Sequence, residues 1–515
     1  MVYFRLLTKK GLFVLFFLLI MQLQQLQAAP KHKFNLIIAP GTLGTKEVTL
    51  LWAKSPVKKP VYELFVNGKL LGSTGKTNYT FEQLKPNTWY TVKVVLRSAK
   101  VEGAELNTIR FKTTRVGKVY NILDYGAKAD GLSNNAKAIQ EAINACHPGG
   151  TVYIPEGTFL SGALYLKSDM TLFIAKGGVL KGTTNVEDYL PMILNRFEGW
   201  EMKTYASLIN AGTLNRNGTY NVKNLKITGS GTIMGGGRKL GEAMTKTNGI
   251  RSRGRLICLM NCQDVSLSKL TITEPPCWTI HYIYSDNVSC HDLNIITKNI
   301  RNGDGIDPDS STDSYIFNCT FDTGDDCIAI KSGKNPEGFF VAKPTTNVQI
   351  THCDFLRGHG ISIGSEMSGG VSDVLVQDCK AGNLLHGMQI KGTRDRGGYV
   401  KDVSVVDCQL LQITIFSAVN YNNDGEAAPQ IPTFENFVFK NIDMTMAPLV
   451  GYAIDINGFK EPAHRLKNVS FVNISLPADA KISVKDAEKV SFKEVRTTAG
   501  LKPEYVLSNS SDLIY

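Results

Sequence analysis

Asp402-Val403-Ser404-Val405 is one copy of a short phrase that recurs from residue 265 to the end of the chain. The residue two places after the valine position is apolar in every copy, and no helical pattern separates the copies. Short strands repeated in this way predict coils stacked about 4.8 Å apart in a parallel β-helix. The valine position falls at residues 265, 288, 314, 348, 374, 403, 437, 469 and 490, with Ser314 and Phe437 in the two irregular copies.

Cysteine occupies a matching place in four consecutive copies. The fifth residue after the valine position is apolar throughout, and it is Cys319, Cys353, Cys379 and Cys408 in these four. We expect them to point into the coil and to pack as free thiols, like small apolar groups. Because neighbouring coils bring such side chains within disulfide range, pairing stays open as an alternative, with Cys327 as the first candidate for a bridge.

Residues 31–115 have a different pattern. Short runs with alternating apolar residues are separated by turn signals such as Asn67-Gly68 and Lys85-Pro86-Asn87, which predicts an antiparallel sandwich. The stretch from Leu84 to Val92 resembles the tyrosine corner of a fibronectin type III domain, and Trp52 suits its core. This module carries 15 Lys/Arg and five Glu, a net charge of +10 out of +11 for the whole chain. We expect a spacer whose charge leaves room for contact with a polyanion, and no nucleic-acid binding, because no base-stacking platform accompanies the charge.

The first 28 residues read as a secretory signal. Arg5, Lys9 and Lys10 precede the apolar run from Gly11 to Met21, and Leu26-Gln27-Ala28 offers a cleavage site. No later stretch is long and apolar enough to cross a membrane. The expected organisation is a signal peptide at 1–28, a sandwich at 31–115 and a β-helix domain at 120–515, whose open end is capped by a helical segment at 134–146. We expect an exported monomer, in a periplasm, at a cell surface or outside the cell, with no transmembrane span after signal cleavage.

One column of the predicted coils concentrates polar chemistry. Second strands of four successive coils align on Ile306, Ile328, Ile361 and Met388. Two places earlier stand Asp304, Asp326, His359 and His386; Asp325 precedes Asp326, and Lys331 and Lys391 stand three places after the aligned residue. Stacked in register, these side chains form one outward-facing stripe on a rigid support.

Such a stripe suits acid–base catalysis on a sugar. Close carboxylates repel one another, so one keeps a proton and can act as a general acid. Glycoside hydrolysis needs an acid on the leaving oxygen and a base on water. Lys391 and the nearby Arg394 and Arg396 could pair with a carboxylate of the substrate.

Four ordered motifs in this column resemble glycoside hydrolase family 28, the polygalacturonases: Asn302-Gly303-Asp304, Gly324-Asp325-Asp326-Cys327, Gly358-His359-Gly360 and Gln389-Ile390-Lys391. The likeness covers residues 122–515. It implies a right-handed β-helix that hydrolyses pectic α-galacturonosyl bonds with inversion and needs no metal or other cofactor. It assigns Asp325 as the general acid, Asp304 and Asp326 as the groups that activate water, His359 as support for the acid's protonation, and Lys391 as a ligand of a galacturonate carboxylate. Gln389, His386, Arg394 and Arg396 are further substrate-binding candidates.

Two features bear on specificity. Gln389 stands where the family usually has arginine, and an aromatic residue expected on the next coil is not evident near Ile413 and Thr414. The sandwich and the stretch from Phe197 to Ser207 resemble bacterial exo-acting members, which favours action from a chain end. The alternatives are a rhamnogalacturonan-type hydrolase of the same family, a pectate lyase using Ca²⁺ at Asp304, Asp307 and Asp309, and a β-helix that binds carbohydrate without cleaving it.

Overall fold

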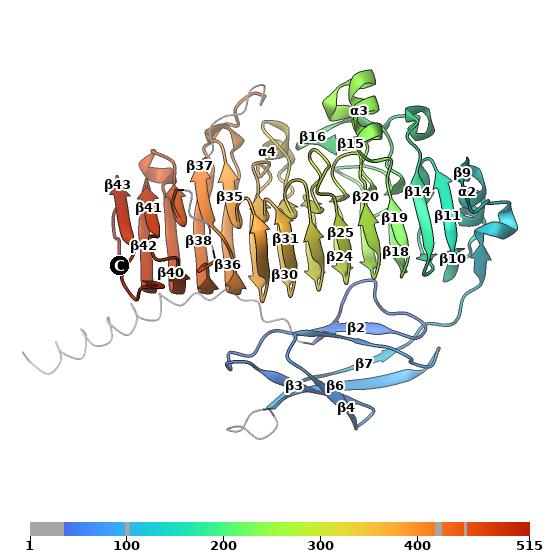
Figure 1. The fold of residues 1–515 in the computed structure, drawn as a ribbon, viewed down its shortest axis with the longest axis horizontal. Coiled ribbons are helices and arrows are strands. Elements are labelled where there is room, and N and C mark those ends of the chain that lie inside the picture. The colour runs from blue at the N-terminus through green and yellow to red at the C-terminus, as the bar shows by residue number, and fades with distance from the viewer. Residues whose placement is uncertain (1–35, 98–103, 418–424, 447–450) are drawn as a thin grey trace, which may run out of the picture.

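The computed structural model describes residues 36–97, 104–417, 425–446 and 451–515 (Figure 1). The expected signal peptide lies outside these residues. Within them the chain forms a long stack of parallel coils and a small antiparallel sandwich beside it. No helix in the described part of the chain has the length and apolar character needed to cross a membrane.

Three parallel sheets run along the stack. We call them the docking sheet, which carries contacts with the sandwich, the cleft sheet, whose strands border a cleft, and the middle sheet, whose strands each follow a docking-sheet strand along the chain. The docking sheet has 13 strands, the middle sheet nine and the cleft sheet twelve. In the docking sheet the strands are β8 (Val119–Asn121), β10 (Gly150–Ile154), β13 (Met170–Ile174), β18 (Val222–Gly229), β21 (Cys262–Ser268), β24 (Asp286–His291), β27 (Thr312–Phe317), β30 (Thr345–Thr351), β33 (Val371–Gln377), β36 (Tyr399–Gln409), β38 (Thr433–Asp443), β40 (Leu466–Leu476) and β42 (Ala487–Thr497).

The other two sheets are built from shorter strands. The middle sheet contains β9 (Asp130–Asn134), β11 (Gly157–Ser161), β14 (Gly178–Gly182), β19 (Thr232–Met234), β22 (Thr271–Thr273), β25 (Asn294–Ile296), β28 (Thr320–Asp322), β31 (Asp354–Gly358) and β34 (Lys380–Leu384). The cleft sheet contains β12 (Leu164–Leu166), β17 (Ile209–Gly212), β20 (Ile257–Met260), β23 (Ile280–Ile283), β26 (Ile306–Asp309), β29 (Ile328–Ile330), β32 (Ile361–Ile363), β35 (Met388–Gly392), β37 (Ile413–Ser417), β39 (Ile454–Asn457), β41 (Lys481–Lys485) and β43 (Glu504–Ser508).

The repeated phrase forms the docking sheet in the expected register. Val265 pairs with Val288, and Val374 pairs with Val403, so equivalent residues stack from coil to coil. Side chains that alternate inward from all three sheets make one continuous apolar interior. This interior explains why a chain with few helices folds: each coil buries its apolar face only against its neighbours.

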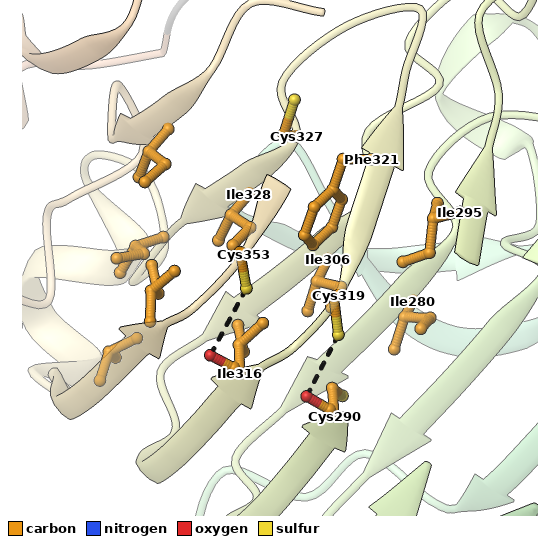
Figure 2. Close-up of a cluster of buried hydrophobic side chains, with 14 of the residues drawn as sticks. Ile280, Cys290, Ile295, Ile306, Ile316, Cys319, Phe321, Cys327, Ile328 and Cys353 are labelled. Atoms are coloured by element: carbon orange, nitrogen blue, oxygen red, sulfur yellow. Dashed lines mark hydrogen bonds between the residues drawn. The ribbon is translucent and has the colours of Figure 1, made fainter. Parts of the chain in front are cut away.

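The cysteines belong to this interior. All ten are buried and free, which confirms the expectation of unpaired thiols. Figure 2 shows Cys319 and Cys353 among isoleucines of neighbouring coils, each with its thiol near a backbone carbonyl of the preceding coil. Cys319 Sγ lies 3.4 Å from the Cys290 carbonyl oxygen. Burial raises the pKa of the Cys327 thiol to about 12, so no thiolate is available there at neutral pH.

Helices and a hairpin close the stack at defined places. Helix α2 (Ala136–Ala145) packs Ile139, Ala142 and Ile143 on the first coils, as the helical period of the sequence predicts. A hairpin of β15 (Ile193–Phe197) and β16 (Trp200–Thr204) and helix α3 (Gly237–Asn248) each lie in a loop between a middle-sheet strand and the next cleft-sheet strand. The short helix α4 (Glu337–Val341) follows the cleft-sheet strand β29. In Figure 1 α3 and the hairpin stand on the side of the coils opposite the sandwich.

The sandwich packs two sheets face to face. One contains β1 (Ile37–Ile38), β2 (Val48–Leu51) and β5 (Asn78–Phe81); the other contains β4 (Lys69–Thr74), β3 (Val61–Val66), β6 (Trp89–Arg97) and β7 (Ala104–Lys112). Trp52 is buried in its core, and the Tyr90 hydroxyl accepts the Lys85 backbone N–H at 2.8 Å. That bond is the one a tyrosine corner makes, as the sequence indicated.

Candidate active site

The four aligned strands of the cleft sheet stack in the register that the sequence predicts. Ile306 pairs with Ile328, Ile328 with Ile361, and Ile361 with Met388. The residues just before these strands therefore lie on adjoining coils. Their side chains reach a cleft of about 460 Å³ on the outer face of the sheet. Asp304, Asp325, Asp326, His359 and Lys391 all line this cleft.

Glycines allow the backbone to turn tightly at His359. Gly358 and Gly360 have φ of +126° and +90°, values that side chains rarely adopt. A Cβ on Gly360 would lie 2.2 Å from the Gly387 carbonyl oxygen of the next coil. The His359 ring is thus held by a turn that only glycine permits on both sides.

His359 bridges two of the carboxylates. Its Nδ1 lies 3.0 Å from Asp325 Oδ1 and 3.8 Å from Asp326 Oδ1. The hydrogen bond that the His359 ring donates to the Asp325 carboxylate raises the pKa of His359. Burial would raise the pKa of Asp325, but the contacts with His359, Lys331 and Lys391 outweigh it and lower that pKa. Each of the two groups therefore favours the charged form of the other.

The acids below this pair behave oppositely. Asp304 and Asp307 are almost fully buried, and Asp304 Oδ1 and both carboxylate oxygens of Asp307 have no hydrogen-bond partner. Burial and the nearby Asp307 and Asp325 raise the pKa of Asp304 well above its usual value. Burial raises the pKa of Asp307 to about 7. The cluster therefore holds protons near neutral pH, as close carboxylates in a dry site do.

Lys331 is the cation at the centre of these acids. Its Nζ lies 3.8 Å from Asp304 Oδ2, 3.5 Å from Asp307 Oδ1 and 3.7 Å from Glu366 Oε2. Burial would lower its pKa, but the surrounding carboxylates raise it well above the usual value, so Lys331 stays charged. The same ammonium lies 4.6 Å from the centroid of the Trp278 ring. The sequence placed Lys331 in the polar column without giving it a role.

The predicted substrate-binding residues divide into two groups. Lys391 lines the cleft with Nζ 3.7 Å from Asp326 Oδ2, and Gln389 lies beside it with its side-chain oxygen 3.4 Å from the same Nζ. The ring centroid of His386 lies 5.8 Å from that of His359. These three are brought to the catalytic column.

Arg394 and Arg396 are not brought there, which corrects the expectation that they pair with a carboxylate of the substrate beside Lys391. Both lie in a short 3₁₀ turn beyond β35. Arg396 is fully buried, donating from Nε to the Ser365 carbonyl oxygen at 2.8 Å and from Nη1 to Asn335 Oδ1 at 2.6 Å. Arg394 forms an ion pair with Glu461. Neither lines the cleft.

A hairpin that the sequence did not assign to the site forms one wall of the cleft. Phe197 and Glu198 at its tip line the cleft together with Trp278, Arg251 and Lys334. Glu366 lines it as well. Sequence reasoning noticed Phe197-Glu198-Gly199-Trp200 only as a resemblance. Its turn signal is Glu198-Gly199 between two short strands, which predicts a hairpin but not where its tip lies.

Buried charges fix the hairpin to the coils. Arg196 is 1% exposed, and its Nη1 donates to Asp309 Oδ1 at 2.7 Å and to Ser310 Oγ at 2.8 Å. Asp309 is therefore covered by the hairpin and does not face the cleft. The Gly199 carbonyl accepts the Lys334 N–H at 3.1 Å, and a Cβ at Gly199 would lie 2.6 Å from that nitrogen. The tip of the hairpin at Glu198 and Gly199 thus packs directly against the backbone of Lys334.

These contacts also remove the calcium ligands proposed for a lyase. Lys331 faces Asp304 and Asp307, and Arg196 takes Asp309. Within the described residues, one group of His, Cys, Asp and Glu has ligand atoms that all lie within 4.8 Å of one another: Asp325, Asp326 and His359. Lys331 and Lys391 already place positive charge near Asp325 of this group, which disfavours a divalent cation there.

Comparisons with known proteins agree with this geometry. Residues 150–496 match glycosyl hydrolases family 28. An exo-poly-alpha-D-galacturonosidase of Dickeya chrysanthemi is 28% identical over 84% of this chain and 85% of its own length, and a probable polygalacturonase of Vitis vinifera is 31% identical over 70% of this chain and 75% of its own.

Solved structures give the same result. The family 28 exopolygalacturonase of Yersinia enterocolitica superposes with a TM-score of 0.85 at 26% identity, covering 93% of this chain and 98% of that one. The expected right-handed parallel β-helix with a small sandwich in front of it is confirmed. With the acids, histidine and lysine of its four motifs gathered at one cleft, the chain belongs to glycosyl hydrolases family 28 and is a glycoside hydrolase.

Proposed function

We propose that the protein is an exo-acting polygalacturonase that hydrolyses α-galacturonosyl linkages of pectin with inversion. The observation that carries the proposal is a carboxylate cluster lying beside cations in one cleft. Lys331, Lys334, Lys391 and Arg251 line the same space as Asp325 and Asp326. A neutral glycan could form no ion pairs with these cations, whereas each galacturonosyl unit of pectin brings one carboxylate that can.

Asp325 is the general acid of this proposal. Its side chain is 25% exposed, against 5% for Asp304 and 6% for Asp326, so it is the carboxyl that can reach a glycosidic oxygen. The proton comes through His359, whose Nδ1 lies 3.0 Å away. When a galacturonate carboxylate neutralises the cations that lower the pKa of Asp325, the proton moves from imidazolium to Asp325 and on to the leaving oxygen.

Asp326 and Asp304 activate the water. Asp326 Oδ1 accepts the Ser362 hydroxyl at 2.7 Å, which leaves its other oxygen directed towards Lys391 and the cleft. Asp304, whose raised pKa keeps it protonated, orients the water while Asp326 takes its proton. Separate acid and base groups acting on opposite sides of the anomeric carbon give inversion.

The position of the hairpin at the cleft supports exo action. The hairpin tip and Arg251 form a wall, and Arg196 fixes that wall by buried ion pairs. A polymer that cannot pass a wall can enter only by its end. The names of the Dickeya and Yersinia relatives, both exo-acting on galacturonan, support the same reading.

A time course on reduced oligogalacturonides of graded length tests the proposal. We expect short products of one size from the earliest times, and a rate about 10³-fold lower in Asp325→Asn. Random cuts in mid-chain would reject exo action, and hydrolysis unchanged in Asp325→Asn would reject the assigned acid.

A rhamnogalacturonan-type hydrolase is the second candidate. The observation that favours it is Gln389, a neutral side chain beside Lys391 where the family usually has arginine. Rates on homogalacturonan and rhamnogalacturonan, measured side by side, distinguish the two. Faster cleavage of rhamnogalacturonan would assign the second function.

We also propose that the protein is exported through a signal peptide at residues 1–28 and acts as a monomer. The positively charged start, the apolar run and the small-residue site after it support export. Sequencing of the mature N-terminus and light scattering of the purified protein test the two statements separately.

A further inference from the structure

We infer that Glu198 and Arg251 recognise the free non-reducing end of the substrate. In this inference, which rests on the proposed function, Arg251 binds the carboxylate of the terminal galacturonosyl unit. Glu198 accepts a hydrogen bond from the 4-hydroxyl, which is free only at that end. Glu198 therefore makes the difference between a chain end and a chain interior.

The two residues form an ion pair in the lining of the cleft. Glu198 Oε2 lies 2.7 Å from Arg251 Nε, and both line the space that holds the catalytic acids. Their side chains are 32% and 35% exposed, so each keeps hydrogen-bonding capacity for a ligand. An arginine held by one carboxylate on its Nε side can offer its other nitrogens to a second carboxylate.

Local backbone geometry argues that glutamate is not there for the turn. Phe197 pairs with Trp200, so Glu198 and Gly199 are the two central residues of the hairpin turn, with φ of +46° and +83°. Asparagine, aspartate or glycine is usual at the first of these positions, and a long side chain there costs roughly 1 kcal/mol. A residue kept against local preference at a site points to a role in binding.

The surroundings hold the pair in place. The Arg251 guanidinium lies 5.0 Å from the Trp200 ring centroid, and Lys334 Nζ lies 4.3 Å from it. Trp200 Nε1 donates to the Asn335 carbonyl at 2.9 Å. With Arg196 anchoring the same hairpin, the carboxylate at the tip is preorganised and pays little ordering entropy on binding.

Charge then explains the rejection of chain interiors. In an α-1,4-linked chain a further galacturonosyl unit replaces the 4-hydroxyl proton, so Glu198 loses its donor. The added unit also brings a carboxylate towards a carboxylate. Unpaired polar groups and like charges placed against the wrong ligand are an effective source of specificity.

Oligogalacturonides of equal length with two kinds of non-reducing end test this inference. One set is saturated; the other ends in a 4,5-unsaturated unit, which lacks the 4-hydroxyl. We expect the wild-type kcat/KM to be about 100-fold lower on the unsaturated set. Glu198→Ala should collapse this ratio towards one, mainly by raising KM on saturated substrate.

Two further variants separate recognition from folding. Glu198→Asn places the residue that the turn prefers at the tip, so it should keep or raise the melting temperature and still lose the discrimination. Glu242→Gln, in the exposed pair Arg238–Glu242 on α3, is the matched control and should leave the ratio unchanged. A ratio that Glu198→Ala and Glu198→Asn leave intact would overturn the inference.

Oligogalacturonides reduced at the reducing end form a third substrate set. They show which end of the chain is recognised and separate a failure of this inference from a failure of the proposed function. If borohydride reduction of the reducing end abolishes cleavage while unsaturation does not, the wrong end has been assigned and the inference fails. If the wild-type enzyme leaves every galacturonide uncleaved, the proposed function itself fails.

Discussion

Acidic residues of the coils contact lysine in two opposite ways. Asp378, which follows β33, and Asp407, which lies within β36, share one lysine of the sandwich, with Lys54 Nζ at 2.5 Å and 2.6 Å from their oxygens. At the cleft, Lys331 faces three carboxylates, and each contact is 3.5 to 3.8 Å long. The first arrangement is a close ion pair and the second a loose cluster.

The difference separates holding from reacting. We call the contact of Lys54 with Asp378 and Asp407 the docking edge, because this close pairing fixes the sandwich to the coils. Two further contacts help: Lys269 pairs with Glu47 and Glu82, and Leu51 packs on Tyr315 and Phe317. In the cleft, incomplete pairing leaves carboxylates that take up and release protons. The acids of the cleft thus destabilise the fold but can exchange protons with a substrate, whereas the acids of the docking edge stabilise the position of the sandwich.

The largest expected effect is on kcat, when one acid of the cleft and one acid of the docking edge are each replaced by asparagine. Asp325→Asn should lower kcat by about 10³-fold, because a general acid contributes that order of rate. Asp378→Asn should leave kcat within about twofold, because its carboxylate only holds Lys54. Steady-state kinetics of the two purified variants, with folding checked by circular dichroism, measure both. Equal losses in the two variants would erase the distinction.

A second prediction concerns stability at the cleft. Asp304 has a raised pKa in the folded protein, so burying its charge costs nothing below the unfolded pKa near 4, and the cost grows as the pH rises towards the folded pKa. Asp304→Asn removes that cost. We expect the free energy of unfolding at pH 7 to rise by about 1 to 2 kcal/mol while activity is lost.

Denaturant unfolding of the wild-type protein and Asp304→Asn at pH 4 to 8 measures this effect. The gap between the two should widen with pH and vanish near pH 4. A variant that is less stable than wild type at pH 7 would contradict the prediction. It would mean that the attraction between Asp304 and Lys331 stabilises the fold by more than the burial of the Asp304 charge destabilises it.

Part of the site could be predicted because it follows the coil register. Asp304, Asp326, His359 and His386 stand at one position relative to aligned strand residues, and pairing such as Ile361 with Met388 brings them together. Loop residues have no such register. Arg396 is near Lys391 in sequence, yet it is buried in the protein. Glu198 and Arg251 reach the cleft from two separate insertions, whose tertiary positions no local pattern encodes.

The docking edge was equally hidden from sequence reasoning, although its elements were not. The strands and tyrosine corner of the sandwich were predicted from alternation and turn chemistry. The +10 charge suggested contact with a polyanion, whereas the structure uses Lys54 and Lys269–Glu47 pairing to dock the module on the coils. Charge counts give the sign of a surface but not its partner.

A third prediction uses pH at the docking edge. His352 Nε2 lies 3.1 Å from the Thr77 backbone nitrogen and accepts its N–H, so the ring must be neutral. Burial, with Lys76 and Lys54 nearby, lowers the pKa of His352 to about 4. The stability from docking is therefore present above the unfolded pKa near 6.5 and is lost as the pH falls towards 4.

The expected loss between pH 7 and pH 5 is about 1 kcal/mol, because solvent reaches part of the ring. His352→Gln keeps an acceptor for the Thr77 N–H and cannot titrate, so this pH dependence should flatten. Thermal unfolding of both proteins across that range measures it. An identical pH profile in the variant would show that another group at the interface titrates instead.

The smallest expected effect is that of Lys54→Met, which keeps the apolar stem of the side chain and removes its charge. Asp378 and Asp407 then face each other without a cation, and we expect docking to weaken by about 0.5 to 1 kcal/mol with kcat unchanged. Adding Asp407→Asn should recover part of the loss, because it removes the repulsion that Lys54 normally screens. A double-mutant cycle on the unfolding free energies measures this coupling. If the cycle shows coupling while kcat stays constant, the acids of the docking edge act only by pairing; a fall in kcat would mean that the sandwich position reaches the cleft through the coils.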